Sequence, residues 1–93
     1  MTVVLLTVEL HFPCARSLKD KRMIVRGLKD RAKKFNIGVA EIDHHDLWQR
    51  ATLGVVTIAA DGAHAERELQ AVADELERAE PGLITRTEVE RLA

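Results

Sequence analysis

Five basic side chains recur along one short segment at helical spacing, and together they could bind an anion. The segment from Ser17 to Phe35 reads SLKDKRMIVRGLKDRAKKF and carries eight cations against two aspartates, in a chain of formal net charge -1. At about 100° per residue, five of the cations fall within roughly one quarter of the helix circumference. This basic ridge consists of Lys19, Arg22, Arg26, Lys29 and Lys33. Because lines of lysine and arginine attract phosphate backbones, the ridge is a candidate nucleic-acid or anion-binding surface.

The same charges have a second interpretation, because they could be paired within the protein. The segment from Glu66 to Glu80 carries six carboxylates against Arg67 and Arg78. If this segment forms a helix beside the basic one, ion pairs between the two helices would neutralise part of the ridge. Charges on a solvated helix face also contribute little individually. The sequence leaves both interpretations open.

A more local anion site is predicted where the basic segment begins. Ser17 has the character of a helix N-cap, with Asp20 three positions later, and the free amides after such a cap attract anions. Arg16 and Lys19 are close to these amides in the sequence. Lys21 falls inside the apolar arc of the helix, where one interpretation is a buried stem with its ammonium at the surface. Alternatively, its ammonium could reach the helix N-terminus and form part of this anion-binding site with Arg16 and Lys19.

The loop HHDLWQR, residues 44–50, holds the other chemically capable side chains. Asp46, Trp48 and Arg50 are predicted to form an interaction loop, since a tryptophan ring either closes the end of a hairpin or stacks on a partner. Adjacent histidines without a wider ligand set do not predict a metal site. Cys14 has no second thiol and no visible base, so the sequence predicts neither redox nor nucleophilic chemistry and no cofactor.

Six elements are predicted to position these residues, from hydrophobic periodicity and turn signals. In order, they are a strand Val3–Leu10, a helix from Ser17 with an apolar stripe through Val25, Leu28 and Ala32, strands Asn36–Asp43 and Ala51–Ala60, a second amphipathic helix between Asp61-Gly62 and Pro81-Gly82, and an edge strand Leu83–Leu92. The order β-α-β-β-α-β is the ferredoxin-like, split βαβ arrangement, an α+β fold with a four-stranded antiparallel sheet and two helices on one face.

The open face of this sheet predicts self-association. Val3 and Leu5 alternate with Val4 and Leu6 in the first strand, so both of its faces are apolar, and the run from Val55 to Ile58 behaves likewise. Strands of this kind need cover on both faces, whereas two helices can cover only one. We therefore expect a homodimer through the sheet face. The alternative is that these residues are ordinary aliphatics of central strands, covered by long surface side chains.

Length and composition indicate one ordinary folded domain. The 93 residues form a single ferredoxin-like domain, 1–93, with 46% hydrophobic and 31% charged residues. The longest apolar run is far shorter than the roughly 20 residues of a membrane span, so no membrane association and a cytoplasmic location are expected. Arginine and glutamate outnumber asparagine and glutamine, a balance that leans weakly towards a thermophilic source.

Two motifs carry a family resemblance. SLKDKR at 17–22, followed by AEIDHHDLWQRA at 40–51, resembles the YlxP-like family of small bacterial proteins of unknown function. Besides the ferredoxin-like fold, the resemblance implies that members tend to be encoded among translation and ribosome-maturation genes. It implies no established activity and no catalytic residues. Cys14 lies outside both motifs.

The sequence favours a nucleic-acid-associated module, RNA or ribosomal, that binds phosphates with the basic helix. Base reading of the RNA-recognition-motif kind needs aromatic residues on the two central strands, and here both strands lack them. The alternative is a protein–protein interaction or assembly module that acts through the open sheet face and the Trp48 loop. No enzyme is expected: acylphosphatase shares the size and fold class, but HFPCARS does not match its glycine-rich phosphate loop.

Overall fold

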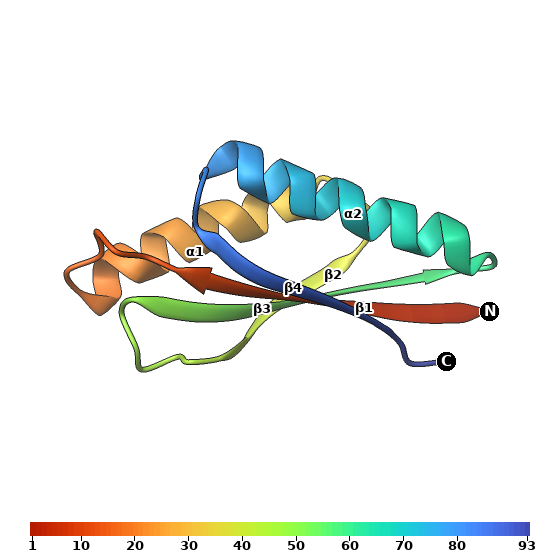
Figure 1. Cartoon of the computed structure of the whole chain (residues 1–93), viewed down its shortest axis with the longest axis horizontal. Coiled ribbons are helices and arrows are strands. Elements are labelled where there is room, and N and C mark those ends of the chain that lie inside the picture. Colours follow the sequence, from red (N-terminus) through yellow and green to blue (C-terminus); the bar gives the residue numbers. More distant parts are fainter.

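Four antiparallel strands form a single sheet, and both helices lie on the same face of it (Figure 1). The computed structural model describes residues 1–93. Its elements are β1 (Thr2–His11), α1 (Leu18–Ala32), β2 (Gly38–Asp43), β3 (Arg50–Ala59), α2 (Gly62–Ala79) and β4 (Ile84–Arg91). This order confirms the predicted ferredoxin-like arrangement. Neither helix combines the length and the apolar character that crossing a membrane requires.

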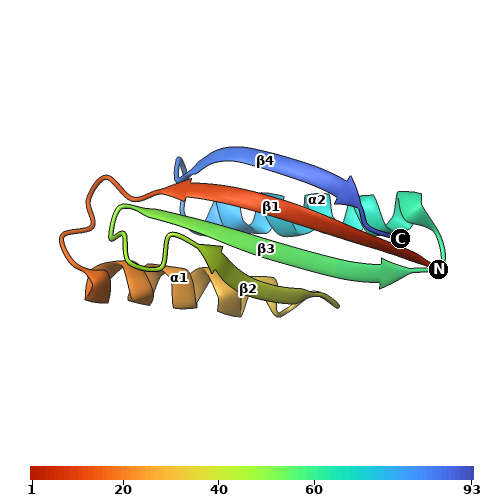
Figure 2. The same ribbon diagram turned by 90° about the horizontal axis from the view of Figure 1, so that it is seen from below.

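β1 is a central strand with partners on both sides. The strands follow the order β2-β3-β1-β4, and β1 pairs with β3 along its whole length, from Thr2 opposite Ala59 to His11 opposite Arg50. Figure 2 shows this sheet from its uncovered side, with both helices behind it and the two chain ends near one another. β4 lies at the edge, as predicted, and its exposed charged side chains discourage pairing with a further strand.

The core lies between the sheet and the helices, and strand alternation decides which residues enter it. Val4, Leu6, Val8 and Leu10 of β1 are buried, while the residues between them are only partly covered. The core is completed mainly by Leu53 and Val55 of β3, Val25 and Leu28 of α1, and Leu69, Val72 and Leu76 of α2. The sheet therefore has one buried face and one open face.

Side-chain caps fix where the helices begin. The Ser17 hydroxyl accepts a hydrogen bond from the Asp20 amide at 3.1 Å, and the Asp20 carboxylate accepts one from the Arg16 amide, also at 3.1 Å. This reciprocal capping confirms the predicted start of α1. At the start of α2, the Asp61 carboxylate accepts a hydrogen bond from the Ala63 amide at 3.0 Å. In both helices, therefore, a short side chain binds a backbone amide that has no partner within the helix.

One small ionic cluster joins α1 to α2. Arg31 Nη1 lies 3.0 Å from one carboxylate oxygen of Glu75, and Arg78 Nη2 lies 2.9 Å from the other. The hydrogen bond from Arg78, and then the one from Arg31, hold the pKa of the Glu75 carboxyl below its usual range. Arg31 does not belong to the basic ridge, so this cross-helix pairing leaves the five ridge cations unneutralised.

We predict that Glu75→Gln lowers the free energy of unfolding slightly at neutral pH and has less effect as the pH falls. A carboxyl whose pKa is lowered by folding stabilises the fold above its unfolded pKa of about 4.3, and that contribution is lost as pH falls through the folded value. Urea unfolding at neutral pH and near pH 3, about one unit below the unfolded pKa, measures the change. Asp30→Asn, which removes an exposed carboxylate of α1 without an ion pair, is the control. A Glu75 effect that stays constant with pH would contradict the prediction.

Candidate anion-binding groove beside helix α1

Three cations of the ridge border a hollow between α1 and β2. Arg22, Arg26 and Lys29 stand at positions i, i+4 and i+7, so helical geometry places them on one side of α1. Together with Val25 and with Glu41 of β2, they line a space of about 170 Å³. β2 is the edge strand of the sheet on this side, as Figure 2 shows. We call this space the basic groove.

No carboxylate directly neutralises the cations of the basic groove. The ion pairs of the protein, counted to 4.0 Å, include no member of the basic ridge. Glu41 is the one acidic residue that lines the groove, and its Oε2 atom lies 2.8 Å from the ammonium of Lys21. Because Lys21 cancels the charge of Glu41, an approaching ligand meets mainly the field of the three cations.

Lys21 itself is not part of the binding surface, and the interpretation that its ammonium reaches the surface is wrong. The side chain is only 1% exposed, and Nζ donates to the backbone carbonyl of His44 at 2.5 Å as well as pairing with Glu41. A buried ammonium needs such partners, because leaving it unpaired in a low-dielectric interior is very costly. Lys21 therefore connects α1 to β2 and to the loop that follows β2.

At the predicted anion site at the start of α1, two of the protein's own side chains already bind backbone amides. The Asp20 carboxylate accepts a hydrogen bond from the Arg16 amide, and the Ser17 hydroxyl accepts one from the Asp20 amide. The Arg16 and Lys19 side chains are exposed nearby. At the other end of the ridge, Lys33 is exposed as the C-cap of α1, where a cation also stabilises the helix dipole. The structure thus gathers Arg22, Arg26 and Lys29 in one groove and leaves Arg16, Lys19 and Lys33 as flanking charges.

The predicted interaction loop is exposed but not assembled into a site. Asp46, Trp48 and Arg50 all lie at the surface, and no hydrogen bond or ion pair joins their side chains. The Trp48 ring keeps 47% of its surface exposed rather than closing the hairpin completely. The loop is anchored at its start, where His44 adopts a φ of 63° and its carbonyl binds Lys21. No three His, Cys, Asp or Glu side chains gather as metal ligands would.

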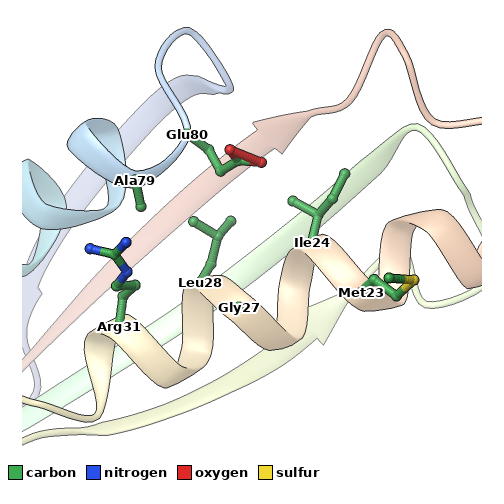
Figure 3. A pocket seen from close by; sticks show the side chains of 7 residues that line it. All are labelled: Met23, Ile24, Gly27, Leu28, Arg31, Ala79 and Glu80. Carbon is green, nitrogen blue, oxygen red and sulfur yellow. The ribbon is translucent and has the colours of Figure 1, made fainter.

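A second hollow, which the sequence analysis missed, lies between the two helices. It measures about 330 Å³ and is bounded by Met23, Ile24 and Leu28 of α1 and by Glu80 after α2, among others. Figure 3 shows Ile24 and Leu28 pointing from α1 into this space, with the Arg31 guanidinium below Ala79. Met23, which borders this hollow, keeps 62% of its surface exposed, but no sequence pattern predicted the hollow. No cluster of polar groups converges on this hollow in the way that a specific site requires.

Sequence similarity to other proteins covers nearly the whole chain. A family described as "Protein of unknown function (DUF503)" matches residues 3–89. The chain belongs to this family. It is also 37% identical over 81 residues to the "Uncharacterized protein YlxP" of Bacillus subtilis (strain 168), a match that covers 80% of this chain and 84% of that protein. The resemblance based on the two sequence motifs is therefore confirmed, and the family carries no assigned activity.

Solved structures of designed proteins share the fold. The "De novo designed protein LFR1 1 with ferredoxin fold" matches with a TM-score of 0.57 at 15% identity and covers 98% of this chain and 83% of that chain. The "De novo designed protein Foldit4" matches with a TM-score of 0.55 at 12% identity and covers 99% and 96% of the two chains. At such low identity these matches show the fold alone.

We predict that Glu41→Leu lowers the free energy of unfolding by about 3–5 kcal/mol, because it leaves the buried Lys21 ammonium without a counter-charge. Lys21→Met should cost less, since the Glu41 side chain keeps 16% of its surface and can be hydrated. The double variant should regain most of the lost stability, because an apolar pair replaces the ion pair. Urea unfolding of the three variants measures these differences. A double variant as unstable as Glu41→Leu would show that the ion pair does not connect α1 to β2 energetically.

Proposed function

We propose that this protein is a cytoplasmic binding module rather than an enzyme, and that α1 binds the phosphate backbone of RNA, either free or within the ribosome. The observation that supports this proposal is the basic groove, where three cations line one hollow and the only carboxylate is already paired with Lys21. Like charges at i,i+3 and i,i+4 repel one another by a few tenths of a kcal/mol per pair. Phosphates placed between them would turn this repulsion into attraction.

The dimensions of the ridge suit an extended polyanion better than a small ion. From Lys19 to Lys33 it spans about 21 Å at 1.5 Å per residue, with the basic groove in the middle. Each phosphate that a cation neutralises releases condensed counterions, which gives affinity without reading the base sequence. Contacts of this kind position a protein on a nucleic acid but do not specify a sequence.

The sheet offers no platform for base recognition. β1 and β3 contain no Phe, Tyr or Trp, and the sheet-based readers of single-stranded RNA stack bases on such residues. Trp48 is the one exposed aromatic ring outside the sheet. We therefore propose backbone binding with little sequence preference.

A second proposal concerns the open face of the sheet, which we propose is covered by a second copy of the chain. Ile42 and Ile58 on this face keep 50% and 65% of their surface exposed. A shallow apolar hollow of about 270 Å³ lies beside Ile42, lined also by Leu5 and Val56 among others. The absence of a side chain at Gly54 keeps this hollow open, since an added Cβ would lie 3.2 Å from the Ile42 side chain. Apolar side chains thus gather on the β2–β3 half of this face. Figure 1 shows that no helix covers it.

A second copy suits this face better than a strongly charged partner. The remaining half of the face carries Glu9, Arg86 and Glu88 around a small polar hollow, so both signs of charge are present. A two-fold axis brings the same patch of each copy together and can match such mixed charges. The basic ridges lie on the helix side and would not approach each other. The alternative function, an assembly module, depends on this same surface.

We predict that the protein binds a single-stranded RNA with an affinity that falls steeply with salt. For three to five phosphate contacts, the slope of log K against log salt should be about -2 to -3.5, since each contact contributes about -0.7 on single strands. The triple variant Arg22→Gln, Arg26→Gln and Lys29→Gln should weaken binding and reduce the slope by about 2. Fluorescence anisotropy across a salt series measures both quantities.

The matched control removes three cations from elsewhere, in the variant Arg67→Gln, Arg78→Gln and Arg86→Gln, which has the same net charge as the triple groove variant. This control should bind RNA nearly as the wild type does, because its altered positions lie outside α1. If both variants lose binding equally, net charge rather than the basic groove is responsible. If the wild type does not bind at low salt, the proposal is wrong.

We predict that the wild type sediments as a dimer at micromolar concentrations and that Ile42→Glu with Ile58→Glu makes it monomeric. Burying two carboxylates against an apolar face is unfavourable, whereas each remains solvated in the monomer. The control Met23→Glu with Leu47→Glu changes two other exposed apolar residues, which lie outside the sheet, and should remain dimeric. Sedimentation equilibrium distinguishes these states. A monomeric wild type, or a dimer that survives the sheet substitutions, would rule out this interface.

A further inference from the structure

The basic groove contains one residue that a simple phosphate site does not need. Glu41 lines the groove with Arg22, Arg26 and Lys29. An isolated carboxylate there would repel phosphate, but the Lys21 ammonium at 2.8 Å from Oε2 compensates its charge. The Oε2 atom is buried and contacts this ammonium, but the contact lacks the geometry of a hydrogen bond. No hydrogen bond involves the other oxygen either, so the Glu41 carboxylate, which lines the groove with the three cations, is an acceptor without a donor.

An ionised carboxylate can only accept hydrogen bonds, so a ligand that forms a hydrogen bond with Glu41 must supply the donor, next to the phosphate that the cations bind. Every nucleotide of RNA carries such a donor, the 2′-hydroxyl of the ribose, whereas DNA has none at that position. We infer that Glu41 makes the basic groove selective for RNA over DNA, by accepting a hydrogen bond from a 2′-hydroxyl whose neighbouring phosphate lies on Arg22, Arg26 and Lys29. This inference rests on the proposed function and specifies its ligand class.

The surroundings of Glu41 favour this role. Its ion pair with Lys21 holds the carboxylate in place, so little side-chain freedom is lost when a ligand binds. The amino groups of bases are also donors, but they differ from base to base, and the sheet provides no aromatic platform to orient them. The 2′-hydroxyl is present on every nucleotide of RNA, so it suits a protein that contacts the sugar-phosphate backbone and not the bases.

The test compares three single strands of one sequence: RNA, 2′-O-methyl RNA and DNA. The methylated strand keeps the sugar oxygen but lacks the donor hydrogen, so it separates hydrogen bonding from backbone shape. We expect the wild type to bind RNA about tenfold or more tightly than the other two, the range for a hydrogen bond to a charged acceptor. Fluorescence anisotropy at one low salt concentration gives the three dissociation constants.

Two double variants test the residue without leaving a buried charge unpaired. Lys21→Met with Glu41→Leu removes the acceptor and should bind all three strands with the affinity that the wild type has for DNA. Lys21→Met with Glu41→Gln keeps an acceptor oxygen at the same place and should retain a preference for RNA. Circular dichroism and thermal unfolding verify that both variants are folded.

The outcomes separate this inference from the proposal on which it rests. Equal binding of RNA, 2′-O-methyl RNA and DNA by the wild type would overturn the RNA preference and leave backbone binding in place. A preference for RNA that persists in the folded Leu variant would overturn the role of Glu41. Failure of the wild type to bind any of the strands would overturn both proposals. A preference that is lost with Leu and kept with Gln would establish Glu41 as the residue that recognises the 2′-hydroxyl.

Discussion

The buried ammonium of Lys21 connects the first turn of α1 to β2 and the loop that follows β2, which lie 20 or more residues later in the sequence. From the first turn of α1 it reaches Glu41 on β2 and the carbonyl of His44 in the following loop. An ammonium that is 1% exposed tolerates little displacement, since each ångström lost from these partners leaves a desolvated charge less compensated. The contact therefore restricts both the rotation of α1 and its sliding along the sheet, and the basic groove has its shape because these two elements keep one relative position.

The same contact explains how a nearly neutral protein keeps one strongly cationic side. Carboxylates of α2 are used elsewhere: Glu75 binds Arg31 and Arg78, and Glu66 lies 3.3 Å from Arg91 of β4. Glu41 of β2, the acidic residue next to the ridge, is paired with the buried ammonium of Lys21. These carboxylates consequently stabilise the fold without neutralising the ridge. The repulsion among the ridge cations remains, and a bound anion would relieve it.

Local patterns in the sequence were enough to predict the strands, the Ser17 cap and the ridge, because each depends on residues within one element. The role of Lys21 could not be predicted in this way. Helical periodicity placed it among apolar residues, but the residue it meets depends on the register of β2, which is irregular between Glu41 and Asp43. A usable signal did exist: Glu41 is two residues after Val39 and therefore shares the core-facing side of its strand. Opposite charges thus occupied inward positions on two elements, Lys21 on α1 and Glu41 on β2. The hollow between the helices gave no comparable signal, since it arises from how α1 and α2 pack.

The fold places its two candidate surfaces so that they do not compete. Both helices, including the cationic α1, lie on one side of the sheet, as Figure 2 shows. The exposed apolar residues Ile42 and Ile58 lie on the open face. A copy docked on the open face would therefore leave both ridges exposed and directed outward. A polyanion long enough to reach both ridges would then bind the second one at high effective concentration. Self-association and backbone binding would in this way reinforce one another, although each depends on a different face of the same sheet.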